Sequence, residues 1–62
     1  MKVFVKFVQN SLHYENGIKQ ENFEDVQEIH YNYNKSNRIA IECHDTGYNY
    51  SINDIAEIEI KE

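Results

Sequence analysis

Hydrophobic and polar residues alternate with a period of two along most of this chain, which is typical of β-strands. Valine, isoleucine, tyrosine and phenylalanine, the residues that favour strands, hold most of the apolar positions. Proline is absent, and no linker rich in glycine or serine divides the sequence. The pattern therefore predicts one all-β domain over residues 1–62.

The strand predicted over residues 2–8 is apolar on both faces. One face carries Val3, Val5 and Phe7, and the other carries Phe4 and Val8 beside Lys2 and Lys6. Other residues must pack on both faces of such a strand, whereas a chain of 62 residues forms only one core. We expect the first set to complete the core. The second set (Lys2, Phe4, Lys6 and Val8) predicts an interface for a second subunit or a target protein.

The next strands can be paired by asking which register keeps apolar faces together. Setting Ile29 opposite Cys43 and Tyr33 opposite Ile39 leaves a three-residue loop that ends at Asn37. Asparagine tolerates the left-handed conformation that such a loop needs.

The same test sets Cys43 opposite Tyr50 and makes residues 39–44 a central strand. The loop is then either the two residues Thr46-Gly47 or the four residues 45–48, because three would mismatch the faces.

Two segments are less regular. Asn16-Gly17 predicts a type I′ turn that closes a hairpin between Leu12–Glu15 and Ile18–Glu21. Near the end, the three-residue spacing of Ile52 and Ile55 predicts a 3₁₀ turn, and the alternation then resumes as a last strand. A helix over 51–62 is the alternative there. Together the predicted strands and turns form a four- or five-stranded antiparallel meander, either a small SH3-like barrel or an open curled sheet.

Acidic residues outnumber basic ones and give a formal net charge of −5. This balance removes the main energy source of nucleic-acid binding. Four tyrosines (Tyr31, Tyr33, Tyr48 and Tyr50) offer a stacking platform for single strands, but the register favours a place for them in the core. The acidic surface residues Glu42, Asp54, Glu57 and Glu59 offer an array that imitates a phosphate backbone.

No pattern of catalytic or metal-binding residues is convincing. Cys43 is expected among apolar neighbours, which leaves its thiol packed rather than activated. His30, Glu42 and His44 share a face, where a cross-strand ion pair is the favoured interpretation and a weak zinc site the alternative. We therefore predict no enzyme, no cofactor and no metal.

Small domains usually need disulfides, a metal or oligomerisation. The single cysteine excludes an internal disulfide and fits a reducing cytoplasm. No apolar run is long enough for a membrane span, and Lys6 interrupts the one that resembles a signal peptide. A homodimer is thus the favoured expectation, and a marginal monomer the alternative.

Residues 23–62 resemble the short all-β accessory proteins of phages and mobile elements in low-GC bacteria. The resemblance lies in Phe23-Glu24-Asp25-Val26, Ile29, Tyr31, Ile39, Ile41, Cys43, Asp45, Gly47, Tyr50, Ile52, Asp54-Ile55 and Ile58-Glu59-Ile60. It implies a non-enzymatic inhibitor that binds a host protein in the host cytoplasm, and it carries over no functional residue. The alternatives are a small nucleic-acid-associated barrel and a structural subunit, in which strand 2–8 adds to another sheet.

Overall fold

The computed structural model describes residues 1–32 and 35–62. In these residues the chain forms two antiparallel sheets, ordered β2-β1-β6 and β3-β4-β5. The strands are β1 (Lys2–Phe7), β2 (Gln20–Phe23), β3 (Val26–His30), β4 (Arg38–Cys43), β5 (Gly47–Ser51) and β6 (Ile55–Lys61). A short helix, α1 (Leu12–Glu15), follows β1, and a 3₁₀ turn, η2 (Ile52–Asp54), precedes β6.

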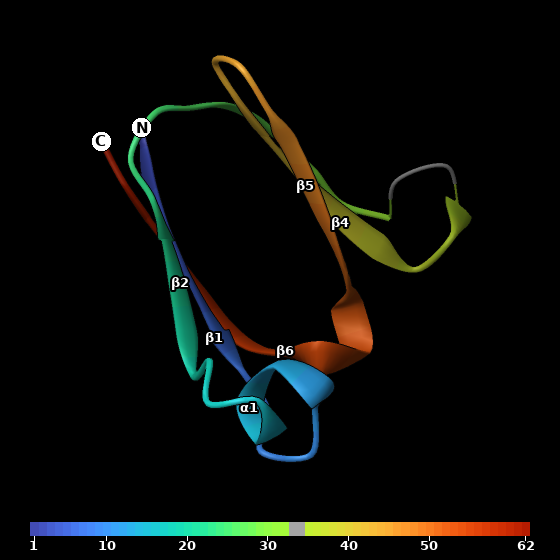
Figure 1. Cartoon of the computed structure of the whole chain (residues 1–62). Helices are drawn as coiled ribbons and strands as arrows, with labels where there is room; N and C mark the ends of the chain where they lie inside the picture. The colour runs from blue at the N-terminus through green and yellow to red at the C-terminus, as the bar shows by residue number, and fades with distance from the viewer. Residues whose placement is uncertain (33–34) are drawn as a thin grey trace.

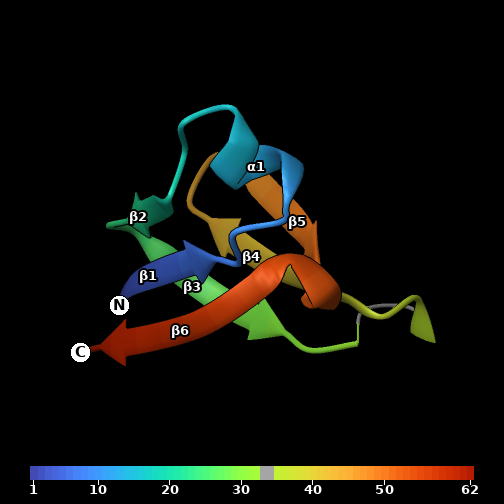
Figure 2. The same cartoon turned by 90° about the horizontal axis from the view of Figure 1, so that it is seen from below.

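The two sheets face each other as two layers, with the chain ends side by side at one end of the molecule (Figure 1). Helix α1 lies at the opposite end, and the strands of the two layers cross at an angle (Figure 2). The predicted all-β antiparallel class is confirmed. The arrangement corresponds to the open curled sheet rather than a closed barrel, and it has more strands than predicted because 20–23 pairs with β1.

The core lies between the layers, and the inner face of β1 is at its centre. Val3 and Val5 are fully buried and Phe7 is 3% exposed, as predicted for that face. The same cluster includes Phe23, Val26 and Ile41 from the strands around it. Burying side chains of this size contributes about 1.5–3 kcal/mol each, so the inner face of β1 is a major source of stability.

The second sheet has the predicted faces but different registers. Ile29 lies opposite Ile41 instead of Cys43, and Tyr50 lies opposite Ile39 instead of Cys43. Both differences are even numbers of residues, which leave each side chain on its predicted face. Alternation alone cannot distinguish such registers. Strand β4 is central, as predicted for residues 39–44.

The loops explain where the predicted registers failed. Strand β3 ends at His30, and the chain turns at once, with Asn32 at φ 54° and Tyr31 largely exposed. Asn37 has the expected left-handed conformation, at φ 57°. The predicted position of Tyr33 lies outside the described residues. After β4, the Cys43 amide donates to the Thr46 carbonyl at 2.8 Å, so this turn comes earlier than predicted.

The predicted hairpin across Asn16-Gly17 is wrong, because residues 12–15 are helical. The Ser11 side chain caps this helix by accepting a bond from the Tyr14 amide. At the other end, Gly17 has φ 89° and donates to the Tyr14 carbonyl, while Ile18 donates to that of His13. This pair of bonds is a Schellman motif, so the glycine that suggested a hairpin turn ends a helix instead.

The C-terminal predictions are confirmed. The 3₁₀ turn spans Ile52–Asp54, and a strand rather than a helix follows it. The Ser51 hydroxyl accepts a bond from the Asn53 amide, which caps the turn. The Val8 amide donates to the Asp54 carbonyl at 2.9 Å, so the turn also fixes the chain just beyond β1.

We predict that Gly17→Ala lowers the free energy of unfolding by about 1 kcal/mol, because an L-residue is strained at positive φ. No atom lies within 4 Å of an added Cβ at either glycine, so sterics do not contribute. Gly47→Ala is the matched control, since its φ is not positive, and we expect a change below about 0.5 kcal/mol. Urea unfolding measures both, and equal effects would contradict the Schellman assignment.

Candidate functional site

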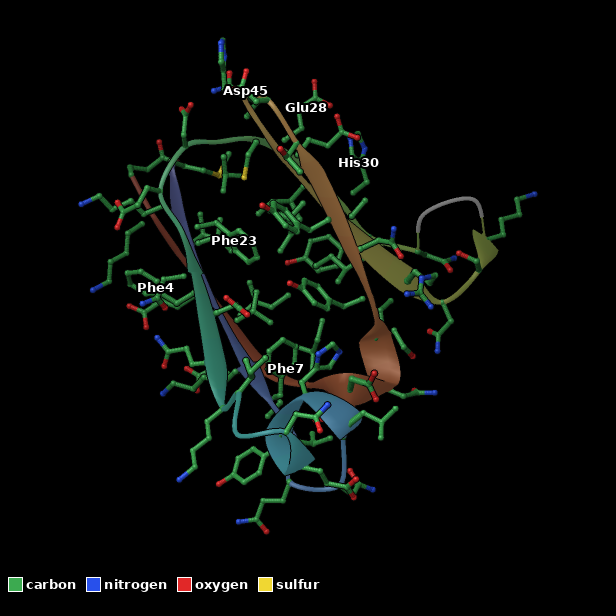
Figure 3. All side chains as sticks on the ribbon, viewed as in Figure 1. Phe4, Phe7, Phe23, Glu28, His30 and Asp45 are labelled. Carbon is green, nitrogen blue, oxygen red and sulfur yellow. The ribbon has the colours of Figure 1, made fainter. Side chains whose placement is uncertain are left out.

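The outward side of the β2-β1-β6 sheet places Phe4 at the centre of a frame of polar side chains. Phe4 lies opposite Asn22 on one neighbouring strand and Glu59 on the other. In Figure 3 it points away from the core, whereas Phe7 and Phe23 point between the layers. We call this surface the Phe4 face; it consists of Lys2, Phe4, Lys6, Gln20, Asn22, Glu24, Glu57, Glu59 and Lys61.

Ion pairs cover the Phe4 face. They join Lys2 to Glu24 at 3.6 Å, Lys6 to Glu57 at 3.7 Å and Lys61 to Glu59 at 3.3 Å. The Lys61 ammonium also lies 5.3 Å from the centre of the Phe4 ring, within the range of a cation–π contact. The charged side chains around it therefore partly bury the Phe4 ring, although they are still about half exposed themselves.

Three of the four predicted interface residues belong to this surface. Lys2, Phe4 and Lys6 alternate along the outward side of β1, as predicted. Val8 is the exception, because the register shifts after Lys6 and the strand ends at Phe7. Strand β1 is hydrogen-bonded on both edges, to β2 and to β6, so it cannot add to another sheet as one alternative required.

The four acidic residues predicted to act together are separated. Glu57 and Glu59 lie on the Phe4 face, each paired with a lysine. Glu42 lies opposite Glu28 on the other sheet, and Asp54 lies in η2 with its carboxylate 3.9 Å from the His13 ring. A single array of these four carboxylates is therefore not formed.

The histidines do not assemble with Glu42. His30 lies opposite Ala40, and its ring nitrogen is 3.0 Å from the Glu28 carboxylate (Figure 3). His44 lies 3.8 Å from the carboxylate of its neighbour Asp45. Among residues 1–32 and 35–62, no three potential metal ligands come together. The predicted cross-strand pair of His30 with Glu42 is therefore wrong, because His30 contacts Glu28 on its own strand.

Aromatic rings from both sheets and from α1 form a seam along one side of the core. Tyr50 lies 5.3 Å from Phe7 and 6.4 Å from Phe23, and Phe23 lies 5.0 Å from Tyr48, between ring centres. The His13 ring stacks on Phe7 at 4.4 Å. Tyr50 therefore packs against the core as predicted, whereas Tyr48 remains 41% exposed, so its predicted core position is wrong. Sequence reasoning missed His13, which no periodic pattern marks.

The fold changes the ionisation of Tyr50. Burial raises the pKa of the Tyr50 hydroxyl above its usual value, and the Glu21 carboxylate raises this pKa further. Cys43, at the C-terminal end of β4, is half-buried against the core cluster, in agreement with the predicted packed thiol. Tyr31 stands apart from this seam and is 62% exposed, so no four-tyrosine platform is formed by the described tyrosines.

The surface of the described residues has no pocket. Within the same ranges, no helix has the length and hydropathy needed to cross a membrane. The chain was also compared with protein-family models, curated proteins and solved structures, and none of them matches it.

We predict that stability falls above about pH 10 in part because of Tyr50. Its pKa is higher in the folded than in the unfolded chain, so the unfolded hydroxyl ionises first and stability is lost as the pH rises towards the folded pKa. Urea midpoints measured from about pH 8 to pH 11 should fall less steeply for Tyr50→Phe than for the wild type. Tyr31→Phe is the control, and the same slope in all three chains would refute the assignment.

Proposed function

We propose that this chain is a non-enzymatic protein-binding module, of the type of a small phage inhibitor, and that the Phe4 face binds its protein partner. The single observation that carries the proposal is an aromatic ring at the centre of the outward side of a sheet. Interfaces commonly have a large apolar residue at the centre and a polar rim, and truncation of such central aromatic residues often removes most of the affinity.

The cover over Phe4 does not prevent binding. Its lysine and glutamate side chains are exposed, between 48% and 71%, and exposed ion pairs contribute only about 0–1 kcal/mol each. A partner can therefore displace them at small cost and bury the Phe4 ring. The other aromatic residues on the described surface do not lie at the centre of a sheet face: Tyr31 lies in a turn, Tyr48 packs on Phe23, and Tyr14 lies in α1 beneath Lys19.

We predict that Phe4→Gln reduces partner capture at least tenfold, which corresponds to a loss of about 1.4 kcal/mol or more of binding free energy. The wild-type chain is immobilised and exposed to a lysate of a low-GC bacterium, and bound proteins are identified by mass spectrometry. Glutamine is a long, uncharged side chain that a partly exposed position on the outward side of a strand tolerates, so the fold should persist.

Tyr31→Gln is the matched control, because it removes an exposed aromatic ring away from the Phe4 face. Proteins retained by the wild type and by Tyr31→Gln but lost by Phe4→Gln support the proposal. Retention of the same proteins by Phe4→Gln, with an unchanged circular dichroism spectrum, would overturn it.

A further inference from the structure

The Phe4 face differs from the rest of the chain in its charge. Its three lysines balance its three glutamates, all joined in the ion pairs described above. The whole formal net charge of −5 is therefore carried by the other residues. The Phe4 face is therefore neutral and has an aromatic ring at its centre, whereas the other residues together are acidic.

This division determines how two copies can approach each other. The negative excess lies outside the Phe4 face, so contact between acidic parts of two copies is opposed by a repulsion that extends over about 8 Å at physiological salt. Contact through the Phe4 face brings two neutral surfaces together and keeps the acidic parts on the outside. The Phe4 face itself therefore adds no excess of like charge to such a contact.

The same face also complements itself. A two-fold axis near Phe4 places the two rings together, and offset or edge-to-face ring pairs contribute about 0.5–1.5 kcal/mol beyond the burial of their area. Because both signs of charge occur around the ring, lysines of one copy can meet glutamates of the other. A strongly basic partner would instead favour the acidic remainder of the surface.

We propose that a second copy of this chain packs face to face on the Phe4 face, about a two-fold axis near Phe4. The inference rests on the proposed function: in the absence of another protein partner, a second copy occupies the same face. The contact is small: three strands about 4.8 Å apart give an area at the low end of specific interfaces. The dimer is accordingly expected to dissociate in the micromolar range or above.

Sedimentation velocity of the whole chain, from micromolar to millimolar concentration, tests the inference. Lys6→Glu gives the face a net charge of −2, and Glu57→Lys gives it +2. Each single variant should weaken its own self-association at least tenfold. An equimolar mixture of the two should form a heterodimer, and the double variant Lys6→Glu/Glu57→Lys, which restores neutrality, should recover the homodimer.

These side chains are more than half exposed, so the variants are expected to fold, and circular dichroism checks this. The control reverses a lysine outside the face, Lys19→Glu, and should weaken self-association less than Lys6→Glu does. A wild type that stays monomeric at millimolar concentration would overturn the inference. Single reversals without effect, or a mixture without heterodimer, would do the same.

The two proposals can fail separately. A monomeric wild type that still shows capture dependent on Phe4 would remove the second copy and leave the protein-binding function in place. Self-association that survives Phe4→Gln, together with unchanged capture, would remove both.

Discussion

The fold depends on one strand, β1, which is hydrogen-bonded on both edges and buried on one face. Its inner residues Val3, Val5 and Phe7 are almost without exposure and contact elements from both sheets. Because the edges are taken by β2 and β6, the outward side is the only part of β1 that remains accessible. The position of Phe4 at the centre of a polar surface is a direct consequence of this constraint, since neighbouring residues in a strand point to opposite faces.

The apolar alternation was sufficient to predict which residues share a face, but not the strand registers. Ile29, Ile41 and Tyr50 all lie on the predicted face, although their cross-strand partners differ from those predicted. An even shift of register leaves the pattern of burial unchanged, so the loops decide between the possibilities. The turn at Tyr31 and Asn32 ended β3 earlier than the alternation indicated, and no residue pattern there marked it.

In the segment 9–18 a strong local signal, Asn16-Gly17, was assigned to the wrong structure. Gly17 does adopt positive φ, but it closes a helix rather than a hairpin. Both a hairpin turn and a helix end use glycine because it adopts positive φ without strain. The feature that distinguishes them here is the Ser11 cap, which is 3% exposed and whose side chain donates to the Val8 carbonyl. The interface residues Lys2, Phe4 and Lys6 were predictable from β1 alone. Their partners in the ion pairs depend on the registers of β6 and on the end of β2.

The central claim is that the outward side of β1 is a protein-binding surface, which a second copy of the chain occupies when no other partner is present. The most direct measurement is a concentration series of backbone amide shifts by nuclear magnetic resonance, from micromolar to millimolar chain. The account predicts concentration-dependent shifts that centre on Phe4 and extend over the outward residues of β1, β2 and β6, with little change in β3, β4 and β5. Spectra that do not change with concentration, or changes centred on the β3-β4-β5 sheet, would contradict it.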